Sequence, residues 1–215
     1  MNFKLVFILV LIGLLFGCKK SNNQAAKMYY TYFPTEINSW VEYEARSIIH
    51  VDALGSDTTY FYLKEIITEE FIDNQGRTTY RVERFEKDSL DQEYELKDVW
   101  YSNITQTTAE KVEENVRFTK MIFPVSENKT WDGNANNTIG KWSYQYDSLH
   151  LPRTYNSLDF DSTVLVSQID NVNPFQRQQA YEVYANYVGL VRKSYINIDN
   201  GDGEELELTV INYGK

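Results

Sequence analysis

The chain is 215 residues long, acidic and rich in aromatic side chains. It carries 21 lysines and arginines against 31 aspartates and glutamates, a net charge of −10 at pH 7. This surplus of negative charge excludes a protein that binds nucleic acid or anionic lipid headgroups through its overall charge. Aromatic residues make up 15% of the chain, while only 10 glycines and 4 prolines interrupt it. The bias favours β-strands over helices.

The first 17 residues have the features of a bacterial signal peptide. Lys4 precedes an apolar run from Leu5 to Phe16, about a dozen residues long and therefore shorter than the ~20 residues that span a bilayer. The run leads into the letters LFGC, and Cys18 is the only cysteine of the chain. This segment resembles the bacterial lipobox, although Phe16 stands where a small residue is usual.

The resemblance implies that a diacylglyceryl group is attached to the thiol of Cys18 and that residues 1–17 are removed. We therefore predict lipidation of Cys18 with chains such as palmitate, a polar tether over residues 18–27 and a single β domain over residues 28–215. A buried structural cysteine and an uncleaved anchor helix are the alternatives. Once Cys18 is lipidated no thiol remains, so the fold cannot depend on disulfides.

The tether indicates on which face of the outer membrane the domain lies. Surface-exposed lipoproteins of the Bacteroidetes often have an acidic cluster just after the lipidated cysteine, whereas KKSNNQAAK at 19–27 has no acidic residue. We expect a protein anchored in the cell outer membrane by its lipid, on the periplasmic face rather than on the cell surface.

From Trp40 onward, runs of alternating apolar and polar residues are separated by turn signals. A spacing of roughly 10–15 residues between turns indicates an all-β fold, an antiparallel meander that forms a curved, partly open barrel or half-barrel with few or no helices. The clearest hairpin turns at DNQGR (73–77), where Gly76 permits a positive φ. The predicted strands are 40–52, 58–71, 78–88, 94–101, 116–124, 141–151, 162–170, 179–187, 189–199 and 204–214.

Two segments allow two interpretations each. TTAEKVEENV at 107–116 is the best helix candidate, because Thr107 and Glu110 can form a capping box, but it can equally extend a strand. DNGDGEE at 199–205 contains closely spaced acidic residues, as a calcium-binding loop does. Gly203 occupies a ligand position, however, and Asn200-Gly201 is a strong turn pair, so a hairpin is the favoured interpretation.

No catalytic pattern stands out. The two histidines, His50 and His150, lie in strand-like runs, and the sequence places no partners beside them for a zinc site or a catalytic triad. The chain also has no Walker-type loop, dinucleotide fingerprint or GxSxG elbow. We therefore predict no catalytic residue, no metal site and no cofactor.

Four Asp-Ser or Asp-Thr pairs resemble the O-glycosylation motif of the Bacteroidetes, in which a small or aliphatic residue follows the hydroxyl residue. The same pairs are also ordinary turn openers. The candidate glycosylation sites are Thr58, Ser89, Ser148 and Ser162.

Alternate apolar positions of the central strands raise the possibility of a ligand cavity. They are predicted to share one concave face, which either holds an acyl chain or is a filled core. These positions are Phe61, Leu63, Tyr80, Val82, Leu96 and Trp100.

Several blocks resemble an uncharacterised family of Bacteroidetes outer-membrane lipoproteins. They are DNQGR at 73, FPVSENKTWDGNANNT at 123, YEVYANYVGLVRK at 181 and INYGK at 211, and the most specific parts are residues 131–134 and 188–191. The resemblance implies a β-rich envelope protein without an assigned activity. Distant relatives in shape, the outer-membrane lipoprotein carriers, hold acyl chains, which is an analogy of fold only.

We therefore expect a lipid-anchored envelope protein that is not an enzyme and that binds or scaffolds an envelope protein partner. The alternative is a carrier of a lipid or another hydrophobic ligand in a half-barrel cavity. An enzyme acting on envelope glycan or lipid is the third possibility. A filled interior favours the binding module, and an open apolar cavity above ~300 Å³ favours the carrier. Convergent carboxylates, or both histidines in one cleft, favour the enzyme.

Overall fold

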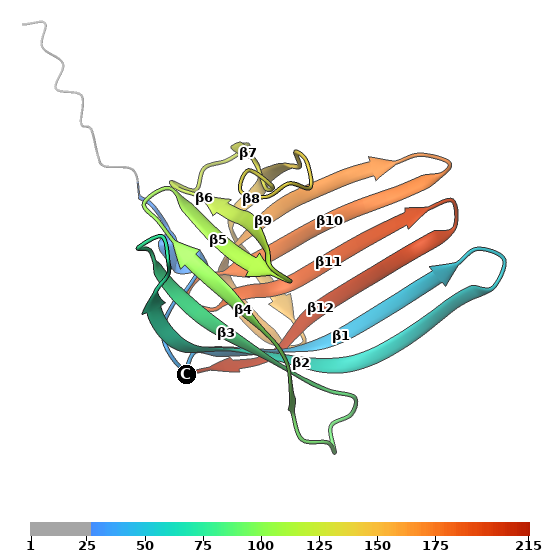
Figure 1. Ribbon diagram of the computed structural model, residues 1–215, viewed down its shortest axis with the longest axis horizontal. Helices are drawn as coiled ribbons and strands as arrows, with labels where there is room; N and C mark the ends of the chain where they lie inside the picture. The colour runs from blue at the N-terminus through green and yellow to red at the C-terminus, as the bar shows by residue number, and fades with distance from the viewer. Residues whose placement is uncertain (1–26) are drawn as a thin grey trace, which may run out of the picture.

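Twelve antiparallel strands form one sheet in the computed structural model, which describes residues 27–215 (Figure 1). The predicted signal peptide, Cys18 and the predicted tether up to residue 26 lie outside the described residues. Over residues 27–215, no helix is both long enough and apolar enough to cross a membrane. The elements are η1 (Tyr30–Tyr32), β1 (Trp40–Val51), β2 (Gly55–Ile72), β3 (Thr78–Lys87), β4 (Glu95–Ile104), β5 (Thr108–Glu113), β6 (Val116–Ile122), β7 (Thr130–Asp132), β8 (Ser143–Tyr155), β9 (Leu158–Val172), β10 (Gln176–Ala185), β11 (Gly189–Asp199) and β12 (Asp202–Gly214).

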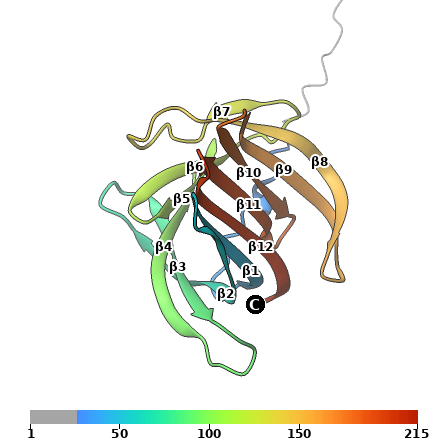
Figure 2. The same ribbon diagram turned by 90° about the vertical axis from the view of Figure 1, so that its right-hand side faces the viewer.

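The sheet curls into a nearly closed barrel in which the first and last strands are neighbours. The strand order is β6-β5-β4-β3-β2-β1-β12-β11-β10-β9-β8-β7, and β1 pairs with β12 from Trp40 opposite Gly214 to His50 opposite Gly203. Figure 2 shows β3 and β4 on one side and β8 on the other, with β1, β11 and β12 between them. The predicted all-β class and partly open barrel are confirmed, but the free edges are β6 and β7, from the middle of the chain.

The turns follow local sequence. Asp73 accepts hydrogen bonds from the N–H groups of Arg77 and Gln75, which lowers its pKa to about 2, and Gly76 has a φ of 76°. This confirms the predicted hairpin between β2 and β3. Asn200 and Gly201 have φ values of 49° and 89° and join β11 to β12, which confirms the hairpin interpretation of residues 199–205.

The helix interpretation of residues 107–116 is wrong, because the segment forms strand β5 and the turn after it. Glu114 and Asn115 adopt φ values of 48° and 63° and turn the chain into β6. Lys111 and Glu113, two residues apart, face the same side of the strand, and both find ionic partners there. These contacts with side chains of β2 and β6 outweigh the capping box that Thr107 and Glu110 could form.

The seam, defined here as the junction between β6 and β7, is joined by isolated hydrogen bonds instead of a continuous ladder. The N–H of Thr119 donates to the carbonyl of Gly133 at 2.8 Å, and the carbonyl of Thr119 accepts from Trp131 Nε1 at 2.8 Å. The hydroxyl of Tyr146 accepts from the N–H of Ile122 at 3.0 Å and donates to its carbonyl at 2.8 Å. Side chains thus satisfy edge groups that a neighbouring strand would otherwise pair.

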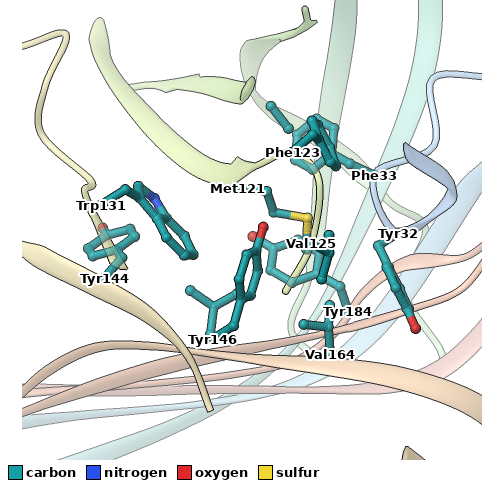
Figure 3. Close-up of a cluster of buried hydrophobic side chains, with 12 residues drawn as sticks. Tyr32, Phe33, Met121, Phe123, Val125, Trp131, Tyr144, Tyr146, Val164 and Tyr184 are labelled. Carbon is teal, nitrogen blue, oxygen red and sulfur yellow. The ribbon is translucent and has the colours of Figure 1, made fainter. Parts of the chain in front are cut away.

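Aromatic packing reinforces the seam (Figure 3). Trp131 lies against Tyr146 with ring centroids 4.6 Å apart and against Tyr144 at 5.9 Å, and Met121 belongs to the same buried cluster. A Cβ atom on Gly133 would lie 2.3 Å from the ring of Tyr144, so only glycine fits. The sequence block at residues 131–134 therefore has a structural role at the seam.

We expect Tyr146→Phe to lower the free energy of unfolding by about 1–3 kcal/mol, because it leaves the N–H and carbonyl of Ile122 without their hydroxyl partner. Urea denaturation followed by tryptophan fluorescence measures the change. Tyr60→Phe, at an exposed position on β2, is the matched control and should stay within about 0.5 kcal/mol of wild type. Equal stability of both variants would mean that the seam does not depend on this hydroxyl.

Candidate functional site

Charged side chains from both halves of the sheet meet inside the barrel. Lys120 on β6 lies at its centre, with its ammonium 2.9 Å from Glu113 on β5 and 2.9 Å from Glu182 on β10. Lys193 on β11 approaches the same two carboxylates at 3.9 and 3.8 Å. We call the whole group the interior ion cluster; its members are Glu65, Arg84, Lys111, Glu113, Lys120, Glu182 and Lys193.

The second part of the interior ion cluster surrounds Glu65 on β2. Its carboxylate lies 2.8 Å from Lys111 and 3.1 Å from Arg84, and Arg84 also contacts Asp98 at 2.9 Å. The guanidinium carbon of Arg84 lies 3.5 Å from the ring centroid of Trp100, a cation–π contact. Each cation of this part therefore has a carboxylate partner.

Burial makes these charges depend on one another. The side chains of Lys120 and Glu182 are only 5% and 2% exposed. Burial alone would raise the pKa of Glu113 and of Glu182, but Lys120 and Lys193 outweigh it and lower both values. Burial would likewise lower the pKa of Lys120, yet Glu113 and Glu182 raise it above the usual range. All three groups are therefore charged at neutral pH.

A tyrosine completes the centre of the interior ion cluster. The hydroxyl of Tyr184 donates to the second carboxylate oxygen of Glu182 at 2.5 Å. Burial and the negative charge of Glu182 raise the pKa of Tyr184 well above its normal value, so the phenol stays neutral and keeps donating. Glu182 thus has a cationic partner for one oxygen and a neutral donor for the other.

Little free space remains inside the barrel. The interior cavity measures about 110 Å³ and is lined by the interior ion cluster together with Trp40, Tyr43, Trp100 and Leu208. Typical small-molecule pockets begin at roughly 300 Å³. An acyl chain here would lie against charged groups and would break their pairing. Of the two predicted interpretations of the concave face, the interior therefore favours a filled core over a lipid cavity.

The predicted concave face is correct in part. Leu63 is buried, and Val82 lies opposite Trp100 across β3 and β4, where both line the interior. Leu96 does not belong to this face: a register shift between β3 and β4 places Leu96 opposite Phe85, and Leu96 is 55% exposed. One extra residue in β4 reverses the side to which earlier side chains point.

The sequence contained a weak signal for the interior ion cluster that was missed. Lys120 stands in FTKMIF and Glu182 in YEVY, so each charge interrupts an apolar or aromatic run. A charged residue on the buried face of a strand requires a partner, but one of the two closest partners of Lys120, Glu182, lies 62 residues away along the chain. Spacing along one strand does not identify such a pair.

The two histidines have different partners. His50 on β1 lies 3.1 Å from Glu205 on β12. His150 on β8 lies with its Nδ1 atom 2.6 Å from the hydroxyl of Tyr32, and burial together with Lys27 lowers its pKa. Within residues 27–215, no group of three His, Cys, Asp or Glu side chains is arranged to hold a metal ion.

The four candidate glycosylation sites differ in exposure. Thr58 is exposed on β2, and Ser89 is half-buried in the turn after β3. Ser148 accepts a hydrogen bond from Arg153 at 3.0 Å, and Ser162 is 2.7 Å from the hydroxyl of Tyr32. Modification of these last two serines would have to disrupt existing contacts, so Thr58 is the most accessible of the four.

No protein-family model and no curated protein matches the chain. Two solved structures are similar to it: a Bacteroides fragilis protein provisionally described as exported, with a YmcC-like fold, and a Parabacteroides distasonis protein provisionally described as a lipoprotein. Each is 11% identical and aligns 85% of this chain with 98% of its own, with TM-scores of 0.45 and 0.44. Neither comparison assigns this chain an activity or a ligand.

We expect Lys120→Met to lower the free energy of unfolding by about 3–5 kcal/mol, because it leaves Glu113 and Glu182 buried without their closest cation. Urea denaturation at neutral pH measures this loss. Lys97→Met removes a largely exposed lysine of β4 that pairs with Glu86, and it should cost less than about 1 kcal/mol. Similar small losses in both variants would show that the interior ion cluster contributes little to stability.

Proposed function

We propose that the protein is a non-enzymatic binding module of the cell envelope, held at the periplasmic face of the outer membrane by fatty chains on Cys18. One observation carries the proposal: paired charges line the interior cavity of the barrel, which measures only about 110 Å³. A barrel with such a core serves as a rigid framework, and its binding surfaces lie on the outside. The lipobox-like segment before Cys18 supports the anchor.

One surface feature favours the alternative, a binder of hydrophobic ligands. An open groove of about 740 Å³ runs beside the first described residues, and its apolar lining includes Tyr30, Phe33, Pro34, Ile104 and Tyr187. Its size exceeds the usual lower limit for a ligand pocket, but the groove is wide open to solvent. A lipid held there would keep much of its surface in water, so it would bind more weakly than in an enclosed pocket.

The anchor predicts that Cys18→Ser abolishes incorporation of a fatty-acid analogue and releases the protein from the membrane fraction. One acyl chain binds a membrane only marginally, whereas two or three bind stably, so losing the attachment point should be decisive. Metabolic labelling and fractionation of whole cells measure both effects. Thermal unfolding of the domain should not change, and equal labelling of wild type and variant would refute the anchor.

The two functions predict different masses for a soluble form that lacks residues 1–18 and keeps every described residue. We expect native mass spectrometry after gentle purification to give the mass of the polypeptide alone, because the interior cavity of about 110 Å³ is smaller than a typical ligand pocket. A co-purified hydrophobic ligand would favour the alternative. Tyr187→Glu, in the lining of the open groove, would then be expected to reduce the ligand-bound fraction.

A further inference from the structure

Three hairpins project side by side from one end of the barrel (Figure 1). We call this region the hairpin end; it comprises residues 49–58, 169–178 and 196–205, around the β1–β2, β9–β10 and β11–β12 turns. The N–H of Asp52 donates to Asp202 Oδ1 at 2.7 Å, and the N–H of Asn200 donates to the carbonyl of Phe175 at 2.7 Å. These two bonds connect all three turns into one surface.

The hairpin end exposes large apolar side chains. Leu54 is 85% exposed and Phe175 is 69% exposed, each in its turn, and Ile49, Val51 and Val172 beside them are also exposed. Single exposed apolar residues are ordinary on protein surfaces. A group of five on adjoining turns is unusual, and such groups mark sites of interaction.

The same region carries most of the net charge of the chain. Its 30 residues include seven acidic residues and a single basic one, Arg177, so its net charge is −6, compared with −10 for the whole protein. The acidic residues are Asp52, Asp57, Asp170, Asp199, Asp202, Glu204 and Glu205. Exposed apolar side chains on turns that also carry acidic residues complement a surface whose apolar pocket is rimmed by basic groups.

Side-chain hydrogen bonds hold the hairpins in place before any partner binds. Asn171 on β9 donates to Gln178 on β10 at 3.1 Å, and Gln178 donates to Asn197 on β11 at 3.1 Å. Gln176 also donates to Asp199 at 3.3 Å, closer to the turns. A surface ordered in this way loses little conformational entropy on binding, which favours affinity.

We propose that the hairpin end docks a protein partner whose surface carries an apolar pocket rimmed by lysine and arginine. This inference rests on the proposed function and names the chemistry of its partner. Leu54 and Phe175 are the anchors that enter the pocket, and the acidic residues steer and orient the approach. Anionic headgroups are repelled by the charge of −6, and two copies of the hairpin end repel each other for the same reason.

The location of the hairpin end suits this role. The first described residues, which continue toward Cys18, lie at the opposite end of the barrel in Figure 1. A protein tethered through Cys18 would therefore present the three hairpins away from its point of attachment. The barrel between them acts as a spacer of fixed length.

The test places a photo-crosslinking amino acid at Phe175 in the full chain in cells, with the same probe at exposed Leu90 as the position control. We expect a protein adduct at Phe175 only, cross-linked through a segment in which apolar residues are flanked by lysine or arginine. Leu54→Ser should lower the adduct yield about tenfold. The double variant Asp199→Asn, Asp202→Asn should also lower the adduct yield, and the yield should then depend less on salt concentration. Ile139→Ser, at an exposed apolar position elsewhere, should leave the yield unchanged.

Other outcomes overturn the proposal. An adduct with a second copy of the chain would indicate self-association, and an adduct with phospholipid would indicate membrane docking. No adduct, or a yield insensitive to Leu54→Ser, would show that the hairpin end is not a docking surface. Fatty-acid labelling of the same cells distinguishes failure of the docking surface from failure of the lipid anchor. If labelling is retained but no adduct forms, only the docking surface is refuted. If labelling is lost, the anchor is refuted.

Discussion

The ion pair between Lys120 and Glu182 is the contact on which the shape of the barrel most depends. Lys120 lies on the edge strand β6 and Glu182 on β10, so the pair connects the two halves of the sheet across the interior. A buried charge without its partner is costly, and any unrolling of the sheet would separate these two. The pair therefore favours one curvature of the sheet, and Glu113 and Lys193 extend the same constraint to β5 and β11.

The seam contacts occupy the free edge of the sheet, and the interior ion cluster holds the strands behind that edge. A sheet that curls without a final ladder leaves two edges exposed, and such edges invite pairing with other chains. Here Trp131 and Tyr146 occupy the free edge of β6 with side-chain hydrogen bonds, while the ion pairs hold the strands behind them at a fixed distance. The edge of β6 and the interior are both occupied, so the proposed docking surface, the hairpin end, and the open groove both lie on the outside of the barrel.

Local signals predicted most of the strands and failed where long-range contacts decide. The turns at Asp73 and at Asn200-Gly201 follow from residues that tolerate positive φ, and the structure has hairpins at both. The segment 107–116 was ambiguous because its capping residues are local, whereas the partners of Lys111 and Glu113 come from β2, β6 and β11. Alternation alone places Leu96 on the wrong face, because it does not reveal the extra residue in β4 that changes the register.

The sequence by itself determined the all-β class, the acidic surface and the positions of the tightest turns, because each depends on composition or on neighbours along the chain. It also contains the lipobox-like signal that predicts the membrane address. Only the tertiary structure decided that β1 and β12 pair, that the seam lies in mid-chain, and that opposite charges meet inside the barrel. These features depend on strand register and on residues far apart in sequence, so they exist only once the sheet has curled.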